Sequence, residues 1–285
     1  MEGQNISDDG RGKELYPIAR IAIPVEKLMG KEYFRLVSSV FSQGYGQMEN
    51  PEGEGHVKLK SMRSFQVFRI LSILLLIRGI VSCSSAKPVI VERPISFGPD
   101  REALTISYLN TRYDLSVTSP EITPRMIVLH WTAIPTLKGS LEAFQPEKLP
   151  SARGDIQGGG ALNVSAHYLI DRDGTIYHLL PDTIMARHTI GLNHCAIGIE
   201  NVGGTADSPL TPEQEEANTR LVRSLVKTYP IEYLIGHYEY TAFEGHPLWL
   251  EKDSGYRTSK TDPGEKFMRK IRENLKNLSF KPVPQ

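Results

Sequence analysis

Two histidines and one aspartate occupy positions that suit a metal site. His130 follows the apolar run 126–129, His237 follows the apolar run 233–236, and Asp262 directly precedes a predicted helix. Two imidazole nitrogens and one carboxylate oxygen suit a catalytic zinc whose fourth position is open to water. Each residue alone has an ordinary structural interpretation, since single histidines are often hydrogen-bonded structural residues and an aspartate before proline is a favoured helix cap.

Glu200 ends another apolar run, 196–200, and is the natural fourth member of this set. Burial disfavours a carboxylate at such a position unless it has a partner. A catalytic role and a charge at the exposed end of a strand are therefore both open from this residue alone.

The elements that must position these residues are short strands and two helices. Strands are predicted at 126–129, 167–170, 175–179, 196–200 and 233–236. Asp171–Gly174 predicts a hairpin turn between the second and third strands. A helix capped by Thr211 ends at Pro230, and a last helix runs from Pro263 to about Leu278. This order predicts one α/β domain with a central mixed sheet flanked by helices.

Five ordered blocks of the chain resemble the zinc-dependent N-acetylmuramoyl-L-alanine amidases of the type-2 amidase family, whose fold is shared with the peptidoglycan recognition proteins. The blocks are VLHWTA at 128–133, SAHYLIDRDGTIYHLL at 165–180, ARHTIGLNHCAIGIENVG at 186–203, IGHYEY at 235–240 and SKTDPG at 259–264. The resemblance covers roughly half of the chain. It implies zinc as cofactor and peptidoglycan or muropeptides as substrate.

Position by position, the resemblance implies His130, His237 and Asp262 as zinc ligands, with Glu200 and Lys260 as catalytic residues. Glu200 would take a proton from water and pass it to the departing amine, and Lys260 would stabilise the oxyanion. The bond cleaved would be the amide between the lactyl group of N-acetylmuramic acid and L-alanine.

Further residues in the matching blocks also receive expected roles. The resemblance implies His188, Asn193 and Trp131 as substrate-binding residues, with a supporting or core role as the alternative for His188. We expect His167 to be structural and Cys195 to be a small buried apolar residue. The stretches 138–160 and 243–259 read as a long polar loop and a long insertion. The first is a candidate groove wall or a disordered tip, and the second a lid or a surface loop.

Residues 62–83 have the pattern of a lipoprotein signal peptide. The apolar run Ile70–Ser82 has thirteen residues, too few for a stable transmembrane helix. It ends in Ile80-Val81-Ser82-Cys83, which resembles a bacterial lipobox and implies lipidation of Cys83. A buried core strand or helix is the alternative.

The remaining segments complete the expected domain organisation. Residues 1–61 form an extension that is either untranslated, with Met62 as the true start, or a genuine regulatory segment. Five prolines between 88 and 124 predict an extended tether over 84–124. The amidase domain is expected at 125–278, followed by a tail at 279–285.

Charge and composition limit the other functional classes. The chain of 285 residues has 33 basic and 33 acidic side chains, so a nucleic-acid partner is not expected. We therefore expect a lipid-anchored amidase of the bacterial cell envelope, facing the periplasm at the outer membrane, that acts in wall remodelling or recycling. A catalytically inactive peptidoglycan-binding lipoprotein and a soluble enzyme for imported muropeptides are the alternatives.

Overall fold

The computed structural model describes residues 88–285, which contain a six-stranded sheet in the order β1-β4-β3-β5-β2-β6. The strands are β1 Ile90–Glu92, β2 Met126–Leu129, β3 Tyr168–Ile170, β4 Ile176–His178, β5 Ala196–Asn201 and β6 Tyr233–Gly236. Only β3 and β4 run antiparallel, as the hairpin predicted, and every other neighbouring pair is parallel. The predicted mixed sheet is confirmed.

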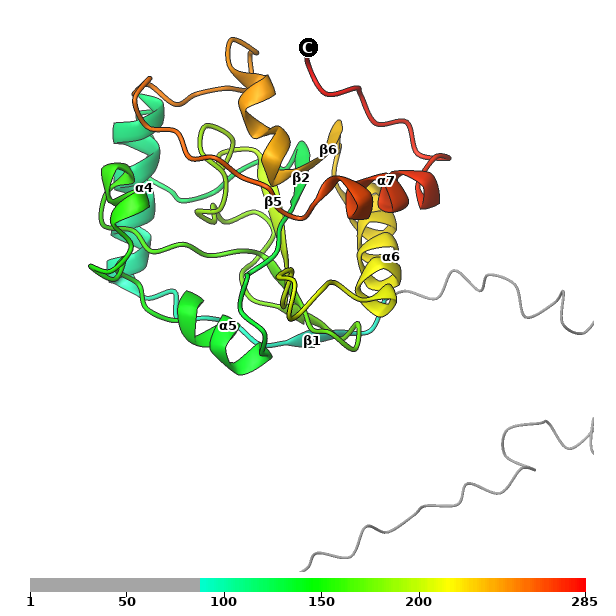
Figure 1. Cartoon of the computed structure of the whole chain (residues 1–285). Coiled ribbons are helices and arrows are strands. Elements are labelled where there is room, and N and C mark those ends of the chain that lie inside the picture. Colours follow the sequence, from blue (N-terminus) through cyan, green and yellow to red (C-terminus); the bar gives the residue numbers. More distant parts are fainter. Residues whose placement is uncertain (1–87) are drawn as a thin grey trace, which may run out of the picture. The chain divides into compact units, whose positions relative to one another are not determined.

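Helices cover both faces of this sheet (Figure 1). They are α4 Pro99–Tyr113, α5 Leu137–Phe144, α6 Pro212–Thr228 and α7 Glu265–Asn274, with the 3-10 segments η1 Gly154–Gly159 and η2 His237–Phe243. Helices α6 and α7 lie on one side, and α4 and α5 lie on the other. Because both faces are covered, β2 and β6 are buried along their whole length, which explains their uninterrupted apolar runs.

Helix α6 begins as its sequence predicts. The Thr211 hydroxyl accepts a hydrogen bond from the Gln214 backbone N–H, and the Gln214 side chain accepts one from the Thr211 backbone N–H. This reciprocal cap fixes the start of the helix. Leu221 and Val222 then join Ile127 of β2 in the main core cluster.

The tether predicted at 84–124 is wrong for its described part, because residues 88–124 belong to the folded domain. Strand β1 pairs with β4, and α4 buries Tyr108, Leu109 and Tyr113. The prolines misled the prediction since they flank these elements, and Pro99 occupies the first turn of α4, where proline is tolerated. The domain therefore starts well before residue 125.

A buried arginine ties α4 to the segment that follows α5. The guanidinium of Arg101 donates to the backbone carbonyls of Phe144, Gln145 and Pro146 at 2.9, 3.2 and 2.6 Å. All three bonds come from Nη2 of a side chain that is 1% exposed, whereas Nε and Nη1 have no hydrogen-bond partner within residues 88–285. The contacts join residues more than forty positions apart and make α4 an integral part of the domain.

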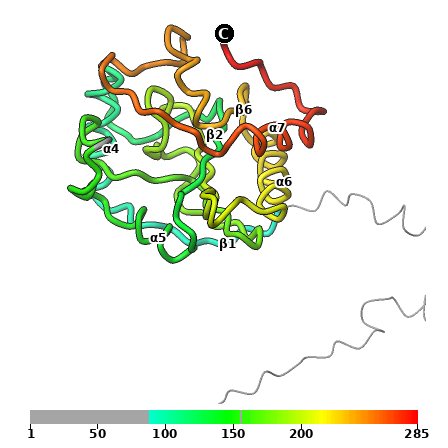
Figure 2. Tube along the Cα trace, in the orientation of Figure 1, coloured from blue at the N-terminus to red at the C-terminus, as the bar shows by residue number. Residues whose placement is uncertain are grey.

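The stretch 138–160 is not one long loop, since it contains all of α5 except its first residue, and the whole of η1. Figure 2 shows η1 beside α4, and Arg112 of α4 donates to the carbonyl of Gly158 at 3.0 Å. The tail at 279–285 is also attached to the domain, because the Lys281 backbone N–H donates to the carbonyl of Glu232 next to β6.

The segments predicted at 1–61 and 62–83, including Cys83, lie outside the described residues. Among the helices of residues 88–285, none is both long enough and apolar enough to cross a membrane.

Candidate active site

Three neighbouring parallel strands deliver site residues to one edge of the sheet. Leu129 of β2 is in register with Ile199 of β5 and with Gly236 of β6. The next residue on each strand is His130, Glu200 or His237, so these three lie in one row at the carboxyl ends of the strands. Ligand and catalytic sites of open α/β sheets are built at such edges.

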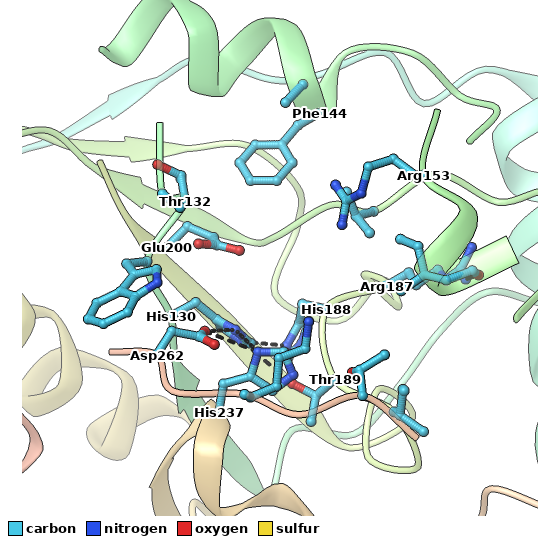
Figure 3. A pocket seen from close by; sticks show the side chains of 18 of the residues that line it. His130, Thr132, Phe144, Arg153, Arg187, His188, Thr189, Glu200, His237 and Asp262 are labelled. Carbon is cyan, nitrogen blue, oxygen red and sulfur yellow. Dashed lines mark hydrogen bonds and ion pairs between the residues drawn. The ribbon is translucent and has the colours of Figure 1, made fainter. Parts of the chain in front are cut away.

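Asp262 joins this row from the segment before α7. The Tyr238 backbone N–H donates to the Asp262 carbonyl at 3.0 Å, which holds that segment beside the start of η2. The Nδ1 atoms of His130 and His237 lie 2.9 Å apart, and Oδ2 of Asp262 lies 3.2 Å from the first and 3.0 Å from the second (Figure 3). The three side chains therefore converge on one point, as predicted.

This triangle fits a small divalent cation. A tetrahedral zinc with bonds of about 2.0–2.1 Å places neighbouring ligand atoms roughly 3.3 Å apart, close to the spacings of this triangle. His130, His237 and Asp262 are 1%, 7% and 7% exposed, so the three ligands are largely shielded from water. Two histidines and an aspartate leave a fourth coordination position open, which is the pattern of catalytic rather than structural zinc sites.

The protonation states of the cluster also suit a metal. Burial lowers the pKa of His237 to about 4; the neighbouring His130 also lowers it, and the Asp262 carboxylate raises it. Burial alone would raise the pKa of Asp262, but hydrogen bonds to His130 and His237 outweigh it and hold that pKa below its ordinary value. At neutral pH His237 is neutral and Asp262 is ionised, as metal ligation requires.

Glu200 lies above the cluster of His130, His237 and Asp262, with its carboxylate directed toward the cavity (Figure 3). Its Oε2 atom is buried, and no side chain or backbone group in residues 88–285 donates a hydrogen bond to it. Burial raises the pKa of Glu200 to about 7, despite the opposing effects of His130 and Lys260. A carboxyl group with this pKa can both accept and return a proton near neutral pH.

A cavity of about 260 Å³ lies over these residues. Its wall includes the three cluster residues, Glu200, Lys260, Trp131, His188 and Asn193. All of the predicted catalytic, metal and substrate-binding residues within 88–285 thus surround one cavity. A molecule held there contacts the His130–His237–Asp262 cluster, a carboxyl group and a lysine together, and these groups could hydrolyse a polarised carbonyl.

The comparison with protein families gives a match over residues 120–265, to the family of N-acetylmuramoyl-L-alanine amidases. The match covers about half of the chain. The chain belongs to this amidase family.

Individual relatives match the chain more narrowly. The endolysin of Escherichia phage T7 is 33% identical over 85 residues, and the endolysin of Enterobacteria phage T3 is 32% identical over 85 residues. Each match covers 28% of this chain and 56% of the relative, so the chain spans about half the length of the curated relatives it matches.

Among solved structures, the amidase LysC from Clostridium intestinale URNW is 23% identical, with a TM-score of 0.42 over 66% of this chain and 98% of LysC. A human peptidoglycan recognition protein in complex with glycosamyl muramyl pentapeptide is 18% identical, with a TM-score of 0.37 over 54% of this chain and 85% of the other.

Two of the expected substrate-binding residues make contacts within the protein. His188 places Nδ1 3.0 Å from Nε2 of His130, and burial, together with His130, lowers the pKa of His188 well below its ordinary value. Asn193 is fully buried, and its Oδ1 accepts the backbone N–H groups of His188 and Thr189. Their contact with substrate remains a prediction.

Trp131 lines the cavity, and the absence of a side chain at Gly204 leaves space for its indole ring. Gly204 has φ +101°, and a Cβ at that position would lie 2.3 Å from the Trp131 ring. Only glycine accommodates both this backbone conformation and the indole. The substrate-binding role predicted for Trp131 remains a prediction.

His167 and Cys195 have the structural roles expected of them. His167 Nδ1 accepts the Gly198 backbone N–H at 3.0 Å, and its Nε2 lies 2.9 Å from the Ile184 carbonyl. Cys195 is buried, and burial raises the pKa of its thiol to about 12.

Sequence reasoning missed several residues that line the cavity of the amidase. Phe144 and Arg153 come from the stretch 138–160, which confirms that this stretch forms a wall. Tyr256 comes from the insertion 243–259; it is buried, and its hydroxyl accepts a hydrogen bond from Arg187 at 3.0 Å, so a plain surface loop is the wrong interpretation there. The Gly-rich and aromatic composition of these stretches was the available signal, but it does not specify contacts made across long sequence separations.

Proposed function

We propose that the protein is a zinc-dependent N-acetylmuramoyl-L-alanine amidase. It hydrolyses the amide bond between the lactyl group of N-acetylmuramic acid and L-alanine in peptidoglycan or muropeptides, during wall remodelling or recycling. The observation that carries this proposal is the buried cluster of His130, His237 and Asp262, placed at one cavity with Glu200, whose buried Oε2 has no hydrogen-bond partner within residues 88–285. The membership of the amidase family supports it.

The proposed chemistry assigns separate tasks to the side chains. A zinc ion, when bound by the cluster, supplies Lewis acidity toward a carbonyl oxygen and acidifies water. Glu200 accepts the proton of the attacking water and delivers it to the amide nitrogen, which leaves only once it is protonated. Lys260 lies at the cavity wall, where its ammonium group stabilises the negative charge that develops on the carbonyl oxygen.

The protonation of Glu200 supports this assignment. A general base must be ionised to take the proton and must hold it long enough to pass it on, which is best met when its pKa is near the working pH. The burial that raises the pKa of Glu200 to about 7 supplies this match.

Release of new L-alanine amino termini from purified muropeptides, counted by mass spectrometry, tests the function. We expect the full chain to release them, chelator to stop the release, and zinc to restore it. Glu200→Gln keeps the shape of the side chain and should abolish release. Glu273→Gln, an exposed change of the same chemistry on α7, should leave release unchanged.

The alternative is a peptidoglycan-binding protein without activity. It predicts that the folded, zinc-loaded chain retains muropeptides but releases no amino termini under any metal condition. Equal retention by the wild-type and Glu200→Gln chains, with no product from either, would favour this alternative.

We also propose that Cys83 is lipidated and anchors the enzyme in the bacterial cell envelope, facing the periplasm. The support is the sequence pattern of residues 62–83 alone. Metabolic labelling with an alkynyl fatty acid should mark the wild-type chain and not Cys83→Ser. Cell fractionation of the same two chains should move the variant from the membrane to the soluble fraction, and sucrose-gradient separation of inner and outer membranes identifies the membrane that holds the wild type.

A further inference from the structure

His130 has two ring nitrogens, and only one of them faces the metal cluster. Nδ1 points to His237 and Asp262, whereas Nε2 lies 3.0 Å from Nδ1 of His188 (Figure 3). A neutral imidazole carries one proton, on either nitrogen, and only the nitrogen without it can bind a metal. The partner of Nε2 therefore decides whether Nδ1 is available.

The second nitrogen of His188 restricts the choice of tautomer. His188 Nε2 lies 3.2 Å from the carbonyl oxygen of Ala196, and a carbonyl only accepts, so this nitrogen carries a proton. The hydrogen bonds and ring contacts of His188 within the described residues are to imidazole, hydroxyl, carboxamide and backbone groups. In the neutral ring a proton on Nε2 leaves the acceptor lone pair on Nδ1, which is the atom that faces His130.

The direction of the His130–His188 hydrogen bond follows from these assignments. Because His188 Nδ1 accepts, His130 Nε2 must donate, and the proton of His130 is held on the side away from the cluster. The Thr189 hydroxyl lies 2.8 Å from His188 Nδ1 and shares the single lone pair of that nitrogen with the His130 Nε2–H group, as a second donor.

The backbone around His188 is held in place by helix α4. Asn193 Oδ1 accepts the N–H groups of His188 and Thr189 at 2.9 and 2.7 Å. The Asn193 backbone N–H and side-chain amide in turn donate to the hydroxyls of Tyr113 and Tyr108, at 3.3 and 3.4 Å. Both tyrosines belong to α4, which precedes the residues matched to the amidase family.

The ring of His188 also packs closely against the sheet. Gly198 of β5 lies beneath it, and a Cβ at that position would lie 2.7 Å from the imidazole. A side chain at residue 198 would therefore displace His188 from His130.

We propose that His188 is a positioning residue for the metal ligand His130, which it holds in the Nε2-protonated tautomer with Nδ1 free to bind zinc, and that α4 supports it through Asn193. This inference rests on the metal site of the proposed function. It gives His188 a task other than contact with substrate. Partners of this kind behind a metal ligand typically account for about 10–100-fold in metal affinity.

Zinc affinity of the full chain, measured by competition with a fluorescent chelator, tests the inference. His188→Ala should raise the zinc Kd by about 10–100-fold. His188→Asn retains an acceptor oxygen near the position of Nδ1 and should recover most of that loss. Tyr113→Phe removes only a hydroxyl group and should raise the Kd by a smaller factor, up to about 10-fold.

His178→Ala and His178→Asn are the matched controls. His178 is also a partly buried histidine with polar contacts, to Glu92, but it lies on β4 and outside the cavity wall. Both changes should leave the zinc Kd unchanged. If His188→Ala does not fold, as judged by its circular dichroism spectrum, the comparison of His188→Asn and Tyr113→Phe with the wild type decides the matter.

The tautomers are directly visible in long-range ¹H–¹⁵N spectra of the zinc-loaded chain with labelled histidine. We expect Nε2 to be protonated in both His130 and His188. A proton on Nδ1 of His188 would overturn the inference. So would a His188→Ala chain with an unchanged zinc Kd and a raised KM, because His188 would then be a substrate contact.

Failure of the proposed function has a different signature. A wild-type chain that binds zinc but releases no amino termini would refute the amidase activity, while the His188 variants would still decide the positioning role. A wild-type chain that binds no zinc would overturn both.

Discussion

Replacing Glu200 by glutamine should make the protein more stable and inactive, and the gain in stability should grow with pH. Burial raises the pKa of this carboxyl group from 4.5 to about 7. Because the folded state holds the proton more tightly than the unfolded state, ionisation of Glu200 opposes folding. The penalty is absent well below pH 4.5, develops as the pH rises toward 7, and is fully present above that.

The magnitude follows from the two pKa values, which differ by about 2.5. At about 1.36 kcal/mol for each pKa unit, ionised Glu200 costs the metal-free fold about 3 kcal/mol at pH 8 and less than about 1 kcal/mol at pH 5. Glutamine has nearly the same shape and no charge, so it removes this cost. The same change removes the proton carrier and should lower kcat by at least about 100-fold.

Urea unfolding of the full chain in chelator, at pH 5 and pH 8, measures the difference. Chelator is needed because a nearby divalent cation favours the ionised carboxylate and hides the effect. The free energy of unfolding of Glu200→Gln should exceed that of the wild type by about 3 kcal/mol at pH 8 and by less than about 1 kcal/mol at pH 5. The free energy of unfolding of Glu273→Gln should lie within about 0.5 kcal/mol of the wild-type value at both pH values. A variant that is no more stable than the wild type at pH 8, or equally stabilised at both pH values, would refute the reasoning.

Further predictions concern the metal, the lysine and helix α4. Chelator should lower the melting temperature of the wild type. Free zinc at 100 times its Kd should raise the free energy of unfolding of the wild type by about 2.7 kcal/mol. Asp262→Ala should contain no zinc by atomic absorption, and neither chelator nor zinc should change its melting temperature. Lys260→Ala should lower kcat by about 100-fold with a smaller change in KM, as steady-state kinetics on muropeptides would show; an unchanged kcat would exclude oxyanion stabilisation. Arg101→Ala should lower the free energy of unfolding in urea by about 3 kcal/mol, because the buried side chain and its hydrogen bonds to the carbonyls of residues 144–146 are lost; a loss below about 0.5 kcal/mol would contradict the integral role of α4.

The sequence was sufficient for those parts of the site that lie on strands. Continuous apolar runs end at His130, Glu200 and His237, and parallel strands buried on both faces have this pattern. Once these strands are neighbours, register alone brings the three residues into one row. Asp262 is different, because no periodicity leads to it; its residue type and its place before a predicted helix suggested a metal ligand, and the resemblance to the amidase family strengthened that prediction.

Helix α4 and the cavity wall could not be predicted from the sequence, because contacts between residues far apart in the chain stabilise them. The buried positions of α4 alternate with polar residues and are flanked by prolines, so its apolar stripe is weak. Arg101 and Arg187 read as surface charges, yet both are buried among backbone carbonyls supplied by residues 144–146 and 156–162. Such partners become visible only when the chain has folded.

His130, the proposed metal ligand, is supported from both faces of the sheet, which explains why so many buried amides surround it. On the side of α6, the Asn218 amide donates to Asn201 at 2.7 Å, and the Asn201 amide donates to the His130 carbonyl at 2.9 Å. On the other side, Asn193 holds the backbone of His188, whose ring meets His130 Nε2.

One network therefore fixes the main chain of His130 and the other fixes its imidazole. Buried amides stabilise a fold only when their hydrogen bonds are satisfied in one arrangement, so each network disfavours any alternative position of the ligand. If the cluster holds zinc as proposed, a site built in this way would be in position before the ion arrives, and zinc binding would cost little reorganisation. Helix α4 is part of that preorganisation, because the hydroxyls of Tyr108 and Tyr113 end the second network.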